Sequence, residues 1–382
     1  MKHLESICVT PLDENELAAM VADAKGPLAI RGGGTRGFGQ SAGQNLCTSG
    51  LSGIGLYEPG ALTIVVRAGT PLVEVEAALA AEGQRLAFEP MDHRGLLGTV
   101  GEPTIGGVVA ANVSGPRRIQ VGACRDFVLG VRFVDGRGVV IKSGGRVMKN
   151  VTGYDLVKLL AGSFGTLGVL SEVALKVLPR PEAVATIAVA GLTAGAPVRA
   201  MSAALGSPFE VTGAAYSPDG REGHAAVMLR VEGSESSVKY RAGQLVGLLA
   251  DFGEIHVEHD PESVAGLWTW VRDVEPFHGA RGDVWRISVK PTDGPEIAAR
   301  LEADGVLYDW GGGLIWALLP ESTDARARLG DFAGHATLVR ASDATRARIA
   351  TFQPEAAPLA AISAGLRAQF DPRGILNPGL MG

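Results

Sequence analysis

Three stretches in the first 180 residues place apolar side chains at helical spacing. The first covers residues 17–24, follows Thr10 and Pro11, which can cap and begin a helix, and ends at Gly26. The other two cover residues 72–79 and 156–160. Apolar or β-branched runs between them predict short strands at 28–31, 63–67, 86–88, 127–134, 139–143 and 168–178. Residues 32–60 and 102–115 are rich in glycine and predict long loops, the second leading into a tight helix of small residues.

The pattern changes after the Pro-Arg-Pro break at residues 179–181. Strands and helices then follow the ferredoxin-like order β-α-β-β-α-β twice, which predicts one antiparallel sheet with helices on one face, able to cap a cofactor. The first series covers 185–190, 195–205, 210–216, 225–231, 235–250 and 254–258, and the second covers 284–289, 293–303, 306–310, 313–319, 323–332 and 335–340. We therefore expect an α+β protein with domains at 1–181 and 182–345 and a C-terminal tail at 346–382.

Gly32, Gly34 and Gly37 match the G-x-G-x-x-G dinucleotide fingerprint after a predicted strand. That fingerprint requires a helix to begin at the loop, and residues 38–45 are too rich in glycine and small polar residues to form one. We therefore reject a Rossmann fold. Bare backbone amides of such a loop can still bind anionic oxygens, with Arg31 and Arg36 supplying positive charge, although a plain surface loop is the alternative.

Composition narrows the classes of partner. The chain has 382 residues, enough for two domains, and its net charge of −6 argues against nucleic acid. The three cysteines are far apart without a CxxC pair, so we expect three unpaired thiols, no iron–sulfur site, and a reducing cytoplasm. The N-terminus does not resemble a signal peptide, and no apolar run approaches the ~20 residues of a transmembrane segment.

Four segments in register resemble the FAD-binding domain of the vanillyl-alcohol oxidase / p-cresol methylhydroxylase (PCMH) superfamily. They are residues 31–39 (RGGGTRGFG), 103–115 (PTIGGVVAANVSG), 162–172 (GSFGTLGVLSE) and 370–379 (FDPRGILNPG). Further segments look like the FAD-binding E subunit of bacterial glycolate oxidases: 114–118, 125–130, 147–155, 170–181 and, less specifically, 309–313. The resemblance implies that residues 1–181 form a PCMH-type FAD-binding domain, to which the tail returns.

By that resemblance, residues 32–36 would bind the FAD pyrophosphate, residues 104–115 would line the flavin and its ribityl chain, and Val169, Leu170 and Asn377 would also contact the cofactor. The implied cofactor-binding residues are Arg31, Gly32, Gly33, Gly34, Thr35, Arg36, Pro90, Thr104, Ile105, Gly106, Gly107, Ala110, Asn112, Ser114, Gly115, Gly168, Val169, Leu170 and Asn377. Some members attach FAD through a histidine of the glycine loop. This loop has Thr35 instead, so we expect non-covalent FAD.

Catalytic residues are harder to assign. Oxidation of a 2-hydroxy acid needs a base for the hydroxyl proton and a cation for the carboxylate. The family's H-x-x-D-G-N-x-H metal motif is absent, and His256 and His259 do not replace it, so no metal is expected. Arg117 and Arg118 could clamp a carboxylate or stabilise reduced flavin, or could form an ion pair with Glu89 or Asp126. His93 is a weak candidate base, with a surface-loop histidine as the alternative. The five tryptophans, including Trp268 and Trp270, are expected in or beside strands, most of them in the core.

These observations predict an oxidoreductase flavoprotein: the FAD-binding subunit of a glycolate oxidase (glycolate dehydrogenase) complex of glyoxylate metabolism. It would contribute to oxidation of glycolate to glyoxylate, and the resemblance implies a catalytic FAD subunit and an iron–sulfur subunit as partners. The expected location is cytoplasmic, or peripheral to the inner membrane through partner subunits. The alternatives are an independent FAD-dependent dehydrogenase of another small hydroxy acid or alcohol, and a non-catalytic assembly subunit that keeps the flavin fold.

Overall fold

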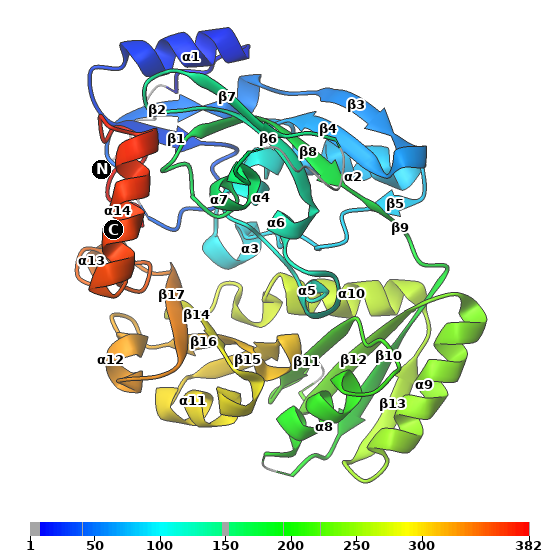
Figure 1. Ribbon diagram of the computed structural model, residues 1–382. Coiled ribbons are helices and arrows are strands. Elements are labelled where there is room, and N and C mark those ends of the chain that lie inside the picture. The colour runs from blue at the N-terminus through cyan, green and yellow to red at the C-terminus, as the bar shows by residue number, and fades with distance from the viewer. Residues whose placement is uncertain (1–7, 40, 147–152, 194, 222, 382) are drawn as a thin grey trace.

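Two antiparallel sheets, one from each half of the chain, organise the fold of the computed structural model (Figure 1). Residues 8–39, 41–146, 153–193, 195–221 and 223–381 are described; most of the segment 147–155 that resembled glycolate oxidase subunits lies outside them. The smaller sheet has the order β3-β4-β8-β6-β7, and the larger has the order β13-β10-β12-β11-β15-β16-β14-β17. Helices accompany both sheets, which confirms the α+β class.

The five-stranded sheet packs its inner face on short helices. Its strands are β3 (Ile54–Glu58), β4 (Thr63–Arg67), β8 (Val169–Lys176), β6 (Val128–Val134) and β7 (Val140–Gly144). Ile64 and Leu175 are fully buried and belong to one core with α4 (Ile105–Ala110) and α7 (Leu156–Leu160). Burying such a side chain stabilises the fold by roughly 1.5–3 kcal/mol. The other helices of this half are α1 (Glu14–Asp23), α2 (Leu72–Ala81), α3 (Arg94–Leu97), α5 (Arg118–Val121) and α6 (Cys124–Phe127).

A small parallel ribbon holds the glycine-rich segment. Strand β1 (Leu28–Arg31) pairs with β2 (Gln44–Cys47), and the described residues between them, 32–39 and 41–43, form no helix, as predicted. The C-terminal tail returns to this ribbon after α14 (Ala357–Phe370), because the Leu28 amide donates to the carbonyl of Ile375 at 2.7 Å and the Asn377 amide donates to the carbonyl of Leu28 at 3.0 Å. Residues 86–88, predicted as a strand, are instead a turn after β5 (Gln84–Arg85), which pairs with β9 (Leu178–Pro179).

The eight-stranded sheet follows the predicted order twice. The first unit is β10 (Ala183–Ala190), α8 (Ala196–Leu205), β11 (Gly213–Ser217), β12 (Ala226–Gly233), α9 (Glu235–Leu249) and β13 (Glu254–Glu258). The second is β14 (Asp283–Val289), α11 (Gly294–Leu301), β15 (Gly305–Asp309), β16 (Leu314–Leu319), α12 (Ala325–Leu329) and β17 (Gly334–Arg340). Tyr216 of β11 pairs with Tyr308 of β15, which joins the two units into one sheet.

Helix α10 (Pro261–Arg272) corrects the expectation that all helices of this half lie on one face. Figure 1 shows α8, α9, α11 and α12 on the side of the sheet away from the first half, whereas α10 lies on the side towards it. Trp268 and Trp270 lie in this helix and not in or beside strands, and the Trp268 indole N–H donates to Thr186 of β10 at 2.9 Å. Asp260 caps the helix and Pro261 begins it, and both are sequence signals for a helix start.

The cysteines also differ from the prediction. Cys8 and Cys47 form a disulfide, with their Cα atoms 5.9 Å apart, whereas Cys124 is buried and free. The expectation of three unpaired thiols is therefore wrong. Residue spacing could not reveal the pair, because it depends on Val9 forming a parallel bridge with Leu46 across the ribbon. Among the described residues, no helix has the length and apolar character needed to cross a bilayer.

Candidate functional site: a cofactor cavity on the glycine loop

A cavity of about 640 Å³ lies against the glycine-rich segment 31–39. Its walls also come from α4, from residues 163–165, from the returning tail, and from the end of β17 with the following helix α13 (Asp343–Arg346). The site is therefore assembled from both halves of the chain. Its volume is typical of cofactor sites, which range over about 300–1,000 Å³.

Most of the residues implied by the family resemblance lie at this cavity. Those in its walls are Arg31, Gly32, Gly33, Gly34, Thr35, Arg36, Thr104, Gly106, Gly107, Ala110, Gly168, Leu170 and Asn377. Those outside the walls are Pro90, Ile105, Asn112, Ser114, Gly115 and Val169. Ile105 and Val169 are buried in the core, while the side chains of Asn112 and Ser114 accept hydrogen bonds from the amides of Arg125 and Cys124, both at 2.9 Å.

Two glycines let the cavity walls approach each other closely. A Cβ atom added at Gly33 would lie 1.6 Å from the carbonyl oxygen of Glu102, and one added at Gly106 would lie 2.6 Å from Ala68. A Cβ added at Gly107 would lie 3.2 Å from Nη1 of Arg36, so the loop and α4 are in contact there. The small residues of both motifs thus have a packing reason, since larger side chains would push the two motifs apart.

Arg36 brings an unpaired positive charge to the cavity wall. Its Nε and Nη2 atoms are shielded from solvent, yet neither has a hydrogen-bond partner among the described residues. Burial lowers the pKa of Arg36 to about 10, with Asp92 acting in the opposite direction, so the guanidinium stays protonated at neutral pH. A buried charge of this kind costs several kcal/mol unless an anion pairs with it. The cavity, the exposed loop backbone and Arg36 together fit the pyrophosphate of FAD.

Asn377 fixes the returning tail at the same site. Its side-chain oxygen accepts from the Ile30 amide at 2.7 Å, and its side-chain nitrogen donates to the carbonyl of Phe164 at 2.8 Å. The oxygen and the nitrogen of the Asn377 side-chain amide therefore connect β1 with residues 163–165. Asn377 has a φ of 44°, a left-handed conformation that asparagine tolerates better than most residues.

His93 is buried, which overturns the surface-loop interpretation. It is 5 % exposed, its ring lies edge-on to Phe38 with centroids 5.2 Å apart, and Nδ1 lies 3.3 Å from the Met91 carbonyl. Burial, together with the positive charge of Arg36, lowers the pKa of His93 to about 3. The imidazole is therefore neutral at physiological pH. His93 does not line the cavity, whereas Phe38, which contacts the His93 ring, does.

Arg117 forms an ion pair with Glu89 at 2.9 Å, one of the two partners that the structural interpretation expected. It also pairs with Glu232 at 2.6 Å, which was not expected, and not with Asp126. Arg230 and Arg85 complete this buried group, which links the first half of the chain to β12. Burial opposes ionisation of Glu232, yet Arg230 and Arg117 together hold its pKa well below the usual range. The Arg117 guanidinium is therefore engaged in structural ion pairs. Arg118 instead lies over the ring of Trp310, outside the cavity walls.

Sequence reasoning missed the contribution of the second half to the cavity. Arg340 and Arg346 line it, and Arg346 donates to the carbonyl of Phe38 at 3.2 Å. Arg340 donates to the carbonyl of Phe277 at 2.6 Å and of Leu96 at 3.2 Å. No local signal marks either arginine, because their roles depend on contacts with residues far away in the chain. His256 lies in β13 and His259 follows it, and the described residues contain no group of three metal-ligating side chains.

Comparisons with known proteins identify the family to which the chain belongs. Residues 6–144 match the family model described as an FAD binding domain. The chain is 39 % identical over 362 residues to glycolate oxidase subunit GlcE of Escherichia coli K12, covering 94 % of this chain and 93 % of that protein. It is 30 % identical over 186 residues to glycolate oxidase subunit GlcD of Bacillus subtilis, covering 47 % of this chain and 38 % of that one.

The solved structure of alkyldihydroxyacetonephosphate synthase superposes with a TM-score of 0.70, covering 97 % of this chain and 76 % of that one. At 15 % identity, this likeness shows the fold, a PCMH-type FAD-binding fold, and nothing about the reaction. The E. coli match extends over nearly the full length of both proteins. The chain therefore belongs to the GlcE family of FAD-binding oxidoreductase subunits.

Proposed function

We propose that this chain is the FAD-binding subunit of a glycolate-oxidising complex and contributes to the oxidation of glycolate to glyoxylate. The observation that carries the proposal is the unpartnered guanidinium of Arg36 in the wall of the glycine-loop cavity, in a chain 39 % identical to GlcE. An anionic dinucleotide would supply the negative partner that the Arg36 guanidinium lacks. The near-complete match to GlcE does not favour an independent dehydrogenase of another substrate.

Within this proposal the backbone of residues 32–36 and the side chain of Arg36 hold the pyrophosphate. Gly106, Gly107 and Ala110 lie beside the flavin, with Thr104 at the start of α4, and Gly168 and Leu170 contact the other end of the cofactor. FAD held by these residues would supply a two-electron acceptor for oxidation of a 2-hydroxy acid. The chain's own task is to position the dinucleotide and to exclude water from it. We place the domain boundary near residue 181, as the sequence predicted.

FAD is bound without a covalent link in this proposal, because Thr35 stands where some superfamily members have a linking histidine. The described residues contain no group of side chains that could hold a metal ion. We propose a catalytic FAD subunit and an iron–sulfur subunit as the partners, with the complex in the cytoplasm or peripheral to the inner membrane.

The test begins with the absorbance spectrum of the purified full-length chain, followed by acid precipitation. The proposal predicts a flavin spectrum, or one restored by added FAD, and release of all the flavin into the supernatant. Co-purification from the native host should then recover an iron–sulfur protein and a second flavoprotein. A colourless chain whose melting temperature ignores FAD would contradict the proposal, since a ligand specific for the folded state must raise it.

A further inference from the structure

Two arginines from opposite sides of the junction between the two halves pack on one tryptophan. The guanidinium carbon of Arg118, in α5, lies 4.5 Å from the ring centroid of Trp310, and that of Arg286, in β14, lies 5.0 Å from it. Neither guanidinium has a hydrogen bond or an ion pair with any described residue in the structure. An indole face attracts a cation, but it does not satisfy the five N–H donors that each guanidinium carries.

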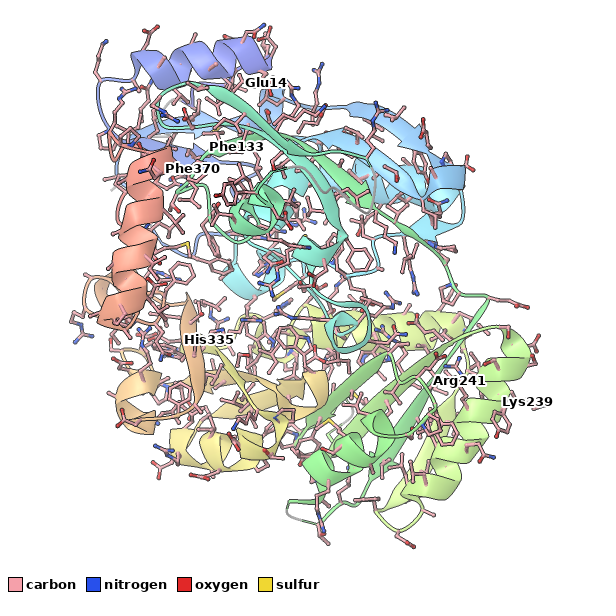
Figure 2. All side chains as sticks on the ribbon, in the orientation of Figure 1. Glu14, Phe133, Lys239, Arg241, His335 and Phe370 are labelled. Carbon is pink, nitrogen blue, oxygen red and sulfur yellow. A yellow bond between two sulfur atoms is a disulfide. The ribbon has the colours of Figure 1, made fainter. Side chains whose placement is uncertain are left out.

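Arg286 belongs to the face of the large sheet that is turned towards the FAD-binding half. Alternate residues of β14 point to opposite faces, and Trp285 and Ile287 pack in the core on the helix side. Val284, on the same face as Arg286, joins the core shared with the first half of the chain. His335 of β17, labelled in Figure 2, pairs with Ser288 of β14, the strand that carries Arg286. Burial lowers the pKa of His335, and the charges of Arg286 and Arg118 lower it further.

Two acidic side chains lie near the arginines. Asp126 acts on Arg118, but it also pairs with Arg125 and Lys158. Asp309 is 3 % exposed, and its carboxylate accepts a hydrogen bond from the Trp310 amide at 2.7 Å. Burial raises the pKa of Asp309 to about 7, so it carries only part of a negative charge at neutral pH. Burial and the charge of Arg118 lower the pKa of Arg286 to about 10, which leaves it protonated. The cluster therefore has excess positive charge within the protein.

Trp310 adopts a strained backbone conformation. Its φ is 53°, a left-handed conformation that is unusual for a bulky residue. Its indole N–H donates to the carbonyl of Gly115 at 3.1 Å, which ties it to the end of the second flavin motif. Strained residues of this kind persist where the surroundings fix them, often at binding sites. The ring thus fixes both guanidiniums relative to the cofactor-binding half.

We propose that Arg118 and Arg286, packed on Trp310, form a binding site for a small carboxylate at the junction of the two halves. A guanidinium matches the two oxygens of a carboxylate in one plane. The evidence for this site is the pair of guanidiniums that lack hydrogen-bond partners among the described residues. It rests on the proposed function in one respect: a 2-hydroxy acid, or the 2-oxo acid formed from it, would be the occupant.

Calorimetric titration of the full-length, FAD-loaded chain with sodium glycolate tests the proposal, with acetate, phosphate and chloride as further probes at constant ionic strength. We expect saturable binding of glycolate and acetate. Arg118→Gln and Arg286→Gln should each raise the Kd about tenfold or more, because a charge-assisted hydrogen bond is lost. The lysine variants at both positions should bind with intermediate affinity. Arg300→Gln, in an exposed pair on α11, should leave the Kd unchanged.

No saturable response to either carboxylate would overturn the site, as would unchanged binding in the Arg118→Gln/Arg286→Gln double variant. Phosphate or chloride binding as tightly as acetate would overturn the carboxylate assignment. Circular dichroism and retained flavin show whether a variant is folded, and the lysine variants keep the test decisive if a glutamine variant is not. A chain that binds carboxylate but takes up no FAD would contradict the proposed function alone. FAD uptake without any carboxylate response would contradict this inference alone.

Discussion

Glu232 accepts two hydrogen bonds from the guanidinium of Arg117, one from Nε at 2.7 Å and one from Nη2 at 2.6 Å. Arg117 follows the second flavin motif, and Glu232 lies in β12 of the large sheet, so this bidentate pair joins the two halves of the protein. Glu89, with a φ of 46°, accepts from Arg230 on the other side of the same group. The cluster therefore lies between the two halves that together form the walls of the cofactor cavity.

Loss of Glu232 should therefore destabilise the whole chain. We expect Glu232→Ala to lower the free energy of unfolding by about 3–5 kcal/mol, because it leaves the buried charge of Arg117 without its bidentate partner. Urea denaturation measures this change. The matched control is Glu296→Ala, which removes an exposed partner of Arg300 on α11 and should cost less than about 1 kcal/mol. Equal effects of the two substitutions would mean that the buried cluster does not hold the halves together.

Asp309 should give the stability a pH dependence opposite to that of most carboxylates. Its pKa is raised to about 7 by burial, whereas an aspartate in the unfolded chain titrates near 3.9. Between about pH 4 and pH 7 the folded state keeps the proton that the unfolded state has released, so stability falls as the pH rises. Asp309→Asn should remove a decline on the order of 3 kcal/mol across this window. Denaturation curves of the wild type and of Asp309→Asn at several pH values test this prediction. Parallel profiles of stability against pH for the two proteins would contradict it.

Gly33 should tolerate no side chain. A Cβ atom there would lie 1.6 Å from a backbone oxygen, so Gly33→Ala must move the glycine loop or residue Glu102. We expect destabilisation of at least about 1–3 kcal/mol, as for other overpacked sites, and weaker FAD binding. Gly26→Ala is the control, because nothing lies within 4 Å of a Cβ at that position. Thermal melts with and without FAD give both quantities. Wild-type melting of the Gly33 variant would show that the loop is more loosely packed than described here.

Local pattern predicted much of this architecture. The turn residues and the alternation of apolar positions between 183 and 340 were sufficient for the repeated β-α-β-β-α-β order, since each of those elements is short and flanked by glycine, proline or polar residues. The absence of a helix after β1 followed from the composition of residues 38–45. The motifs at 31–39 and 103–115 both contribute residues to one cavity, although Ile105, Asn112, Ser114 and Gly115 lie outside its walls. Their glycines occur where two backbones approach closely.

Features that depend on distant contacts could not be read from the sequence. The charge of Arg36 is visible in the sequence, but its lack of a partner is a property of the folded chain. The same is true of Arg346, which reaches the carbonyl of Phe38, and of the Cys8–Cys47 disulfide across the β1–β2 ribbon. His93 appeared to lie in a surface loop because its neighbours are polar, whereas Phe38 and Phe164 enclose that region.

The most direct test of the account is titration of the apo chain with FAD, followed by flavin fluorescence, for the wild type and for Arg36→Gln. Arg67→Gln, an exposed arginine at the end of β4, is the control. We predict saturable binding by the wild type and by Arg67→Gln, and a Kd at least about tenfold higher for Arg36→Gln. The apo form of Arg36→Gln should melt no lower than the apo wild type, because the substitution removes an unpaired buried charge. Equally tight FAD binding by Arg36→Gln would contradict the cofactor site proposed here.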